Sequence, residues 1–356
     1  MALFWVVLFS AVAAISSAEA SLYNNGVCYG PSHNGVPDLA VAISHYRKFG
    51  LTRIRLMEYD EYDVGALHAM GFEVSFGVNN DELQTLASSY GAVEDWFEKK
   101  VENIIKYNYF VINYIVVGDE AIPGPLAQYV LPVVASLIRL FQSKNKPLIK
   151  VTAAVSPAVL SNLLPPSKAE FTTEIRNHMV PLVYTLAEWG FPLMIKVYPY
   201  KYYAAGLISK EFATFTARHR RPPVFQDGNL SYWNMFDVMV DSFLWAMEKE
   251  GVPNGGSIVV GETGWPSAGN GNFTTPKLAR TYNQNFLNHI TSKDGTPKRP
   301  YVINAGFVYS MFDDNLKPEG AEQHFGISNI DYKPAYHLVF PNASNIEAVN
   351  GGHRNT

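Results

Sequence analysis

The sequence contains a single cysteine, Cys28, among its 356 residues. One cysteine cannot form an internal disulfide and cannot supply the ligand set of a structural zinc site, so packing must stabilise the fold. We expect Cys28 to be a small buried residue of the first strand rather than a reactive thiol. The lone cysteine also excludes an appended disulfide-rich carbohydrate module.

Charged side chains are also scarce, at 17% of the residues, with 28 basic against 32 acidic side chains and a net charge of -4. A chain without an excess of basic residues lacks the positive electrostatic potential that attracts the phosphates of nucleic acids. We therefore expect no nucleic acid partner. We also expect no cofactor, no metal and a monomeric protein. Hydrophobic residues make up 47% of the chain and aromatic residues 13%, which is enough for a large globular core.

Only one long apolar run occurs, at residues 3–15, and it is too short to span a membrane. Ala18-Glu19-Ala20 follows it with the small-x-small spacing that signal peptidase cuts, so residues 1–20 are predicted to be a secretory signal peptide. Cleavage after Ala18 is the alternative. The tail at 342–356 is hydrophilic, and we expect no membrane anchor.

Short apolar or β-branched runs recur between residues 21 and 341, and segments with helical spacing separate them. A strand and a helix repeated eight times predict an α/β fold, the (β/α)8 or TIM barrel, as one domain over residues 21–341. A doubly wound open sheet is the alternative, but no G-x-G-x-x-G sequence follows the first run. The eight runs span residues 26–29, 52–56, 73–78, 113–117, 149–155, 193–198, 257–261 and 304–311.

Two carboxylates come directly after predicted strands. Glu120 follows the fourth run, and Glu262 follows the seventh. The strand ends form the catalytic face of such a barrel, so these side chains would face each other across a pocket. Glycoside hydrolysis needs one protonated and one ionised carboxyl group. The spacing alone fits a structural role equally well, in which each acid caps a helix or pairs with an arginine.

Three longer motifs occur in order: Gly261-Glu262-Thr263-Gly264-Trp265-Pro266-Ser267, then residues 279–285, then residues 295–300. Shorter matches, such as residues 27–30 and 324–326, extend over the mature chain. Together they resemble the plant endo-β-1,3-glucanases of glycoside hydrolase family 17. The resemblance implies a (β/α)8 barrel that cleaves internal bonds of a β-1,3-glucan polysaccharide with net retention at the anomeric carbon.

The resemblance also implies roles for individual residues. Carried over by position, Glu262 matches the family's nucleophile and Glu120 its acid/base. Asp314, Lys317 and Glu322 lie in a stretch that resembles the family's supporting polar residues. A fixed cation at Lys317 would keep Glu262 ionised. Without the resemblance, Lys317 is better interpreted as a solvated loop lysine.

Aromatic residues at or near the strand ends form a candidate sugar-binding surface. Flat rings can stack on the apolar faces of glucose while their polar tips bond hydroxyl groups. Ordinary core packing is the alternative, and we prefer it for Trp96 and Trp245 on predicted helices. The predicted substrate-binding residues are Tyr29, Tyr198, Tyr200 and Trp265, with Tyr202 and Tyr203 nearby.

Several positions depart from the residues usual in the family. Asp119 stands before the acid/base, where the family usually has Asn, and an ionised Asp accepts hydrogen bonds without donating them. Asp119 is therefore either an ionised defect or a protonated donor, and we favour the protonated form because crowded carboxylates tend to keep one neutral. Lys196 replaces a usual Asn, Lys201 stands where an aromatic is common, and Asp314 replaces a common Glu.

These observations leave three functions open. The first is a retaining endo-β-1,3-glucanase. The second is a glucan-binding protein of the same fold with little catalysis. The third is an enzyme that cleaves mixed-linkage β-1,3-1,4-glucan. Changes in the loops and aromatic residues alone would be enough to alter the linkage preference in this way. Sequons at Asn229, Asn272 and Asn342 suit a secreted protein of the cell wall or apoplast, with the vacuole as the alternative destination.

Overall fold

The structure is a computed structural model that describes residues 25–30, 39–51, 53–58, 64, 67, 72–102, 112–146, 149–217, 222–292, 294–302 and 305–340. The signal peptide expected at residues 1–20 lies outside the described residues. The tail expected at 342–356 and the Asn342 sequon also lie outside them.

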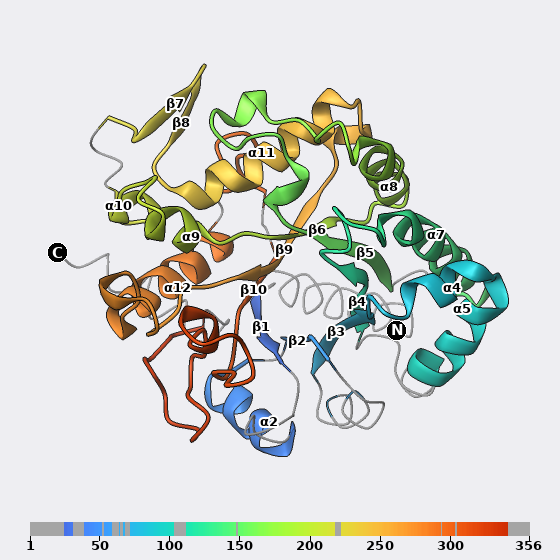
Figure 1. The fold of residues 1–356 in the computed structure, drawn as a ribbon, viewed down its shortest axis with the longest axis horizontal. Helices are drawn as coiled ribbons and strands as arrows, with labels where there is room; N and C mark the ends of the chain where they lie inside the picture. The colour runs from blue at the N-terminus through green and yellow to red at the C-terminus, as the bar shows by residue number, and fades with distance from the viewer. Residues whose placement is uncertain are drawn as a thin grey trace, which may run out of the picture.

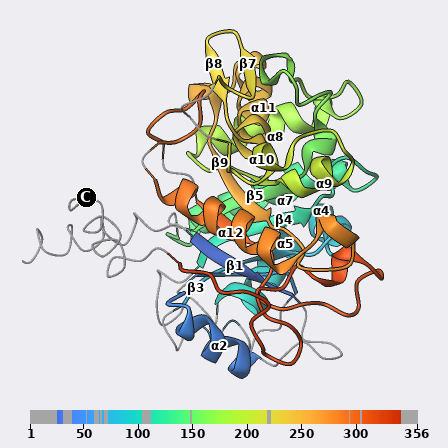
Figure 2. The same ribbon diagram turned by 90° about the vertical axis from the view of Figure 1, so that its left-hand side faces the viewer.

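Eight parallel strands close into a barrel, and helices pack around its outside (Figures 1 and 2). This confirms the predicted (β/α)8 barrel. The order around the barrel is β1-β10-β9-β6-β5-β4-β3-β2. The barrel strands are β1 (Asn25–Tyr29), β2 (Arg53–Leu56), β3 (Glu73–Val78), β4 (Ile112–Asp119), β5 (Lys150–Val155), β6 (Leu193–Lys196), β9 (Ile258–Thr263) and β10 (Gly306–Val308).

Each of the eight predicted runs overlaps one of these strands. Their β-branched and apolar residues suit strands that are buried on both faces. The sequence did not predict a separate antiparallel hairpin of β7 (Phe225–Asp227) and β8 (Leu230–Tyr232), which stands outside the barrel (Figure 1). Gly228 turns this hairpin at a φ of +58°, a conformation that glycine adopts readily.

Several helices begin at polar side-chain caps, and the longer helices bury an apolar face against the barrel. Asn234 caps α11 by accepting from the Asp237 N–H at 2.8 Å, and Thr275 caps α12 by accepting from Leu278. The α-helices are α2 (Leu39–Lys48), α4 (Leu83–Ser88), α5 (Tyr90–Phe97), α7 (Ala127–Ser143), α8 (Arg176–Glu188), α9 (Pro199–Ala204), α10 (Lys210–Ala213), α11 (Met235–Lys249) and α12 (Pro276–Thr291). Shorter helical turns are Glu98–Glu102, Pro157–Val159, Pro166–Lys168, Pro253–Gly255, Gly271–Phe273 and Ala321–Gln323.

Two predictions about single core residues can be compared with the structure. Cys28 is fully buried in β1, and its thiol donates to the Gly261 carbonyl at 3.4 Å, as expected for a structural cysteine. Burial raises the pKa of this thiol, which keeps it protonated. Trp96 is buried on α5, as predicted, whereas Trp245 is half-buried on α11 beneath the ammonium of Lys298.

Candidate active site

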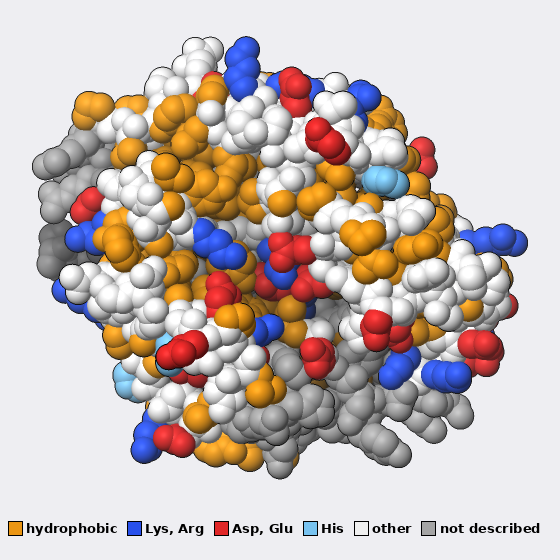
Figure 3. Space-filling model, viewed as in Figure 1, with side chains coloured by type: hydrophobic (Ala, Val, Ile, Leu, Met, Phe, Trp, Pro, Cys, Tyr) orange, Lys and Arg blue, Asp and Glu red, His pale blue; other side chains and the backbone are white. Residues whose placement is uncertain are grey.

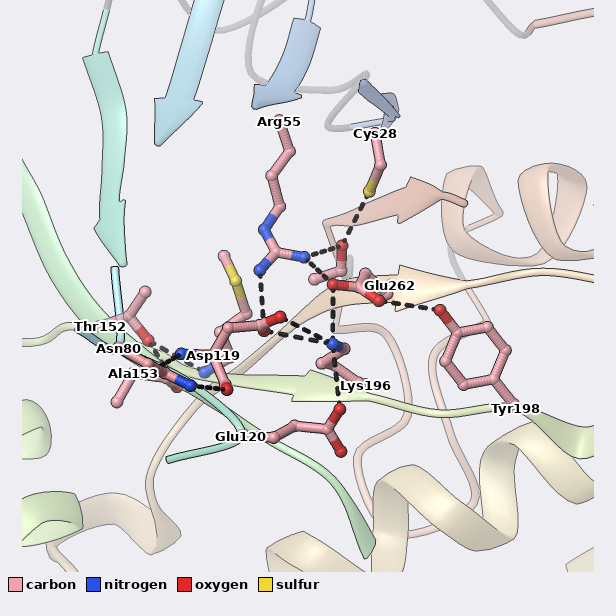
Figure 4. A network of polar contacts seen from close by, with 12 residues as sticks. Cys28, Arg55, Asn80, Asp119, Glu120, Thr152, Ala153, Lys196, Tyr198 and Glu262 are labelled. Atoms are coloured by element: carbon pink, nitrogen blue, oxygen red, sulfur yellow. Dashed lines mark hydrogen bonds and ion pairs between the residues drawn. The ribbon is translucent and has the colours of Figure 1, made fainter. Parts of the chain in front are cut away.

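Glu262 lies near the carboxyl end of β9, and its carboxylate is almost completely buried (Figure 4). Arg55 from β2 donates to its Oε1 at 2.5 Å, and the hydroxyl of Tyr198 donates to its Oε2 at 2.9 Å. The Lys196 ammonium lies 3.1 Å from the same Oε1. Two cations and one hydroxyl therefore hold this carboxylate in a single orientation.

Lys196 ends β6 and is the centre of the charged network in Figure 4. Its Nζ lies 3.0 and 3.2 Å from the two oxygens of Asp119. The same nitrogen lies 3.1 Å from Oε2 of Glu120 and 3.1 Å from Oε1 of Glu262. One buried ammonium thus joins three carboxylates that come from β4, its following loop and β9.

The chain bends sharply where β4 delivers Asp119 and Glu120. The register of β4 against β5 shifts between Val116 and Asp119, and Gly118 has a φ of +73°. Glu120 itself has a φ of +49°, which is uncommon for a residue with a side chain. Asn80 clamps the bend, because its side chain accepts from the Asp119 N–H and donates to the Asp119 carbonyl, each at 2.9 Å. The bend turns consecutive carboxylates toward Lys196.

Arg55 supports the site from the opposite side of the barrel. Its guanidinium is 3% exposed, and it donates to the Gly261 carbonyl at 3.1 Å as well as to Glu262. Its second terminal nitrogen lies 3.4 Å from Oδ1 of Asp119. A planar guanidinium can bridge two carboxylates in a fixed geometry, which suits a positioning role.

These charges set the protonation of the two glutamates. Burial alone would raise the pKa of Glu262, but the charges of Lys196 and Arg55 lower it to about 2. Burial also raises the pKa of Glu120, but the charge of Lys196 and hydrogen bonds from Ser156 and Lys196 lower it below its ordinary value. Both glutamates are therefore ionised near neutrality in the unliganded site.

Asp119 differs from the protonated donor that the sequence favoured. Both of its carboxylate oxygens accept from the Lys196 ammonium, and Oδ1 also accepts from Arg55. Contacts of both oxygens with cations favour an acceptor over the protonated donor. The sequence shows several carboxylates near this position, but it does not show that the cations of Lys196 and Arg55 lie beside Asp119.

The predicted aromatic residues have three different environments. Tyr198 is half-buried and contacts Glu262 directly. Trp265 is fully buried, and its indole N–H donates to the Phe273 carbonyl at 2.9 Å, so its predicted stacking on sugar is wrong for this structure. Tyr29 and Tyr200 are 1% and 5% exposed and likewise present almost no ring surface to a ligand. Core packing accounts for these three residues better than sugar binding.

The predicted supporting residues lie along the loop after β10. Asp314 is buried, and its Oδ1 accepts from the Leu316 N–H at 2.9 Å. Lys317 and Glu322 are exposed, and within the described residues Lys317 forms no ion pair. The fixed cation expected at Lys317 is therefore supplied instead by Lys196 from the adjacent strand β6 and by Arg55 from β2 across the barrel.

An open pocket of about 290 Å³ adjoins the charged network. Figure 3 shows acidic and basic side chains gathered at the centre of this face, with hydrophobic side chains around them. The polar wall combines Glu120 and Lys196 with Ser156, and the rest is largely apolar or aromatic, which suits a sugar with hydroxyl edges and apolar faces. The pocket is lined by Glu120, Ser156, Pro157, Ala158, Lys196, Tyr198, Lys201, Tyr202, Leu207 and Met239.

The sequence missed the roles of Arg55 and Asn80. Arg55 could have been found, because a charged residue between the apolar Ile54 and Leu56 of the short strand β2 requires a buried partner. Within the described residues, no group of three or more histidine, cysteine, aspartate or glutamate side chains is arranged to hold a metal ion. None of the helices in the described ranges is both long and apolar enough to cross a membrane.

Comparisons with known proteins agree on one family. The model of Glycosyl hydrolases family 17 matches residues 25–340. Over 317 residues, the chain is 43% identical to a protein of Arabidopsis thaliana named probable glucan endo-1,3-beta-glucosidase BG4, covering 88% of this chain and 90% of that protein. It is 34% identical to Lichenase-2 of Hordeum vulgare, covering 93% and 99%. The solved structure of CJP38, a beta-1,3-glucanase and allergen of Cryptomeria japonica pollen, matches with a TM-score of 0.81 at 35% identity, covering 89% and 99%.

Proposed function

We propose that this protein hydrolyses internal bonds of β-1,3-glucans with retention at the anomeric carbon. The chain belongs to glycosyl hydrolases family 17 and is therefore a glycosidase. Relatives named for endo-1,3-beta-glucosidase activity support this substrate. The open pocket beside Glu120 also supports it, because an internal bond of a polymer must enter from the side.

In the proposed first step, Glu262 is the nucleophile. Its Oε atom attacks the anomeric carbon, the bond to the leaving oxygen breaks, and a covalent glycosyl-enzyme forms. The cations at Arg55 and Lys196 support this role because they keep the carboxylate ionised. The Tyr198 hydroxyl supports it by fixing one oxygen of Glu262, so that the other can be directed at the sugar.

Glu120 is the acid/base in the same proposal. It gives its proton to the leaving oxygen in the first step, and in the second step it takes a proton from the water that attacks the anomeric carbon. The second step releases Glu262 as a free carboxylate and restores the proton on Glu120. The side chain of Glu120 suits this exchange because it is 43% exposed and lines the pocket.

One observation carries the assignment. Glu120 and Glu262 each place an oxygen 3.1 Å from the same Lys196 nitrogen. The two oxygens therefore lie no farther apart than twice that distance. Retaining glycosidases hold their carboxyl groups about 5 to 5.5 Å apart, whereas inverting enzymes need roughly 6.5 to 9.5 Å for an intervening water. The shared contact supports direct attack by Glu262.

The test is an activity panel on laminarin, mixed-linkage β-1,3-1,4-glucan and cellulose, with Glu262→Gln as the catalytically impaired control. We expect laminarin to be cut into oligosaccharides by the unaltered protein, and the Glu262→Gln variant to lose several orders of magnitude in turnover while retaining laminarin binding. Binding of laminarin without release of reducing ends by the unaltered protein would instead identify a glucan-binding protein.

A mixed-linkage activity is the second candidate, because the chain is as similar to Lichenase-2 as to several glucan endo-1,3-beta-glucosidases. Faster cleavage of mixed-linkage glucan than of laminarin in the same panel would favour it.

We also propose that the protein is secreted, on the basis of the signal sequence and the sequons. Asn229 and Asn272 are both exposed, as a glycan requires. Purification from a plant secretory host should give a chain that begins at Ser21 or Glu19, and a chain that still begins at Met1 would contradict secretion.

A further inference from the structure

The Lys196 ammonium is placed where its position controls both glutamates at once. It lies 3.1 Å from an oxygen of Glu120 and 3.1 Å from an oxygen of Glu262. The lysine side chain is 9% exposed, so solvent screens these contacts little. A movement of this one nitrogen would change the environment of the acid/base and of the nucleophile together.

Asp119 is the residue that determines where this nitrogen lies. Both oxygens of Asp119 contact the ammonium, at 3.0 and 3.2 Å, whereas each glutamate contributes one oxygen. Asp119 is itself fixed, because Asn80 holds its backbone from both sides and Arg55 lies 3.4 Å from its Oδ1. The aspartate therefore holds the ammonium from one side while the two glutamates contact it from the others.

The charges of the network indicate that Asp119 and Lys196 act together and not as two independent residues. Three carboxylates face two cations, so the described network carries one net negative charge. Removing the charge of Lys196 alone leaves three carboxylates against Arg55. Removing the charge of Asp119 alone leaves two carboxylates that share two cations. Neutralising both residues restores the original net charge of the network.

We propose that Asp119 and Lys196 act as one positioning unit for the two glutamates, an inference that rests on the proposed function. Lys196 fixes the relative positions of Glu120 and Glu262. Asp119 fixes Lys196 and draws part of its charge away from the acid/base. The unit makes no bond to the reacting carbon, and its effect on the reaction passes through the glutamates.

The unit also sets how activity depends on pH. Glu120 must be protonated to act as an acid, and a cation beside it opposes protonation. Without Asp119, Lys196 would act more strongly on Glu120, so activity should be lost at lower pH. Without Lys196, three carboxylates would crowd together, so activity should persist to higher pH. The other groups that face this network are Arg55 from β2, Cys28 from β1, Ser156 after β5, Tyr198 and Lys201 after β6, and Tyr309 after β10.

The experiment compares Asp119→Asn, Lys196→Met and the double variant on laminarin across pH 3.5 to 8. Each single variant should lower kcat/KM about tenfold or more, while the double variant should lose no more than the weaker single variant. The pH at which kcat/KM falls to half of its acid-side plateau should move down by at least about half a unit in Asp119→Asn and up by at least about half a unit in Lys196→Met. Losses that multiply in the double variant, or pH shifts of the same sign, would overturn the proposal.

Lys249 and Glu170 provide a matched control pair. They form an ion pair at 2.9 Å on the surface, and Lys249→Met, Glu170→Gln and their double variant should leave the pH profile unchanged. Should Lys196→Met fail to fold, Asp119→Asn still decides the proposal through its pH profile, because the Asp119 side chain is 41% exposed and its neutralisation should not prevent folding.

A readout that does not require catalysis separates this inference from the proposed function. The unfolding temperature of the double variant should exceed that of Lys196→Met. In Lys196→Met three carboxylates repel one another with Arg55 as their cation, and the added Asp119→Asn substitution removes one of these negative charges. If the unaltered protein cleaves no glucan, the proposed function fails and this thermal comparison still tests the pair. If the protein cleaves laminarin but the changes in unfolding temperature caused by the two single substitutions add up in the double variant, the proposed function stands. The proposal that Asp119 and Lys196 act as one unit then fails.

Discussion

The ammonium nitrogen of Lys196 lies 3.1 Å from Oε1 of Glu262, and the two residues are register partners on the adjacent strands β6 and β9. The register shifts between Ile195 and Lys196, which brings this side chain to the level of Glu262. A buried cation is thus part of the barrel wall itself and does not depend on a mobile loop.

Replacing Glu120 by Gln should separate the acid role from the rest of the site. Turnover of laminarin should fall by about 100-fold or more, because the leaving oxygen then receives no proton. Turnover of a dinitrophenyl β-laminarioside should fall far less in its first step, because that leaving group needs no acid. Stopped-flow measurement of the dinitrophenolate burst checks this, and an equal loss on both substrates would contradict the assignment.

Arg55→Met should destabilise the protein and impair catalysis together. Removal of the guanidinium leaves the buried carboxylate of Glu262 with one cation fewer, and breaking such a buried pair costs about 3 to 5 kcal/mol. Urea unfolding measures the loss of stability, and laminarin hydrolysis measures the loss of activity. Arg53→Met is the matched control on the same strand, because Arg53 pairs with Glu73 at 2.8 Å and not with Glu262.

Tyr198→Phe should lower kcat with little change in stability. The lost hydroxyl donates to Oε2 of Glu262 at 2.9 Å, and a hydrogen bond to a charged group contributes about 1.5 to 3 kcal/mol, or roughly 10- to 100-fold in rate. Tyr200→Phe is the control, because the Tyr200 hydroxyl accepts from Asn270 instead. Steady-state kinetics of both variants on laminarin check the prediction, and equal rates for the two would contradict it.

Activity on natural glucans should be highest in acid. Glu262 is ionised above about pH 2, so the proposed nucleophile carries its charge throughout the accessible range. The lowered pKa of Glu120 means that the protonated acid disappears as pH rises, and kcat/KM should then fall about tenfold per pH unit. Initial rates on laminarin from pH 3 to 8 measure this decline. An optimum at or above pH 7 would show that Lys196 does not control the protonation of Glu120.

Asp241 should make folding stability depend on pH at a point away from the active site. Burial raises the pKa of this carboxyl to about 7, and the charge of Asp237 adds to the rise. Its stabilising contribution is present in full below the unfolded pKa of about 4 and is lost as pH rises through about 7. Relative to the unaltered protein, Asp241→Asn should therefore gain on the order of 4 kcal/mol of unfolding free energy between pH 4 and pH 8.

Urea unfolding at both pH values measures this gain. Asp331→Asn, at an exposed position, is the control and should show no such change. A constant difference between Asp241→Asn and the unaltered protein across this range would contradict the prediction.

The barrel and its carboxylates could be predicted from sequence because both depend on local patterns. Glu120 and Glu262 each follow an apolar run, and the topology of the barrel brings the ends of such runs together. The contact between Asp119 and Lys196 could not be predicted, although each residue was singled out. They are 77 positions apart, and their meeting depends on register shifts in β4 and β6 that no local pattern encodes.

The direction of side chains after a strand end was the weakest prediction. Trp265 follows β9 but turns into the core, where its ring packs against Tyr200 and Tyr282 at centroid distances of 5.3 and 5.5 Å. Gly264 permits this turn, because a Cβ at that position would come within 2.2 Å of the Tyr309 carbonyl oxygen. The position of a residue at a strand end therefore identified the functional face of the barrel. It did not distinguish the residues that line the pocket from those that pack in the core.

Covalent trapping tests the central claim most directly. The protein is incubated with a 2-deoxy-2-fluoro-β-laminaribiosyl fluoride, which slows the second step of a retaining reaction, and the digest is mapped by mass spectrometry. We predict one glycosyl group per chain, attached to Glu262, and none on the Glu262→Gln variant. A label on another carboxylate, or turnover of laminarin to an initial α-anomeric product with no label, would contradict the account.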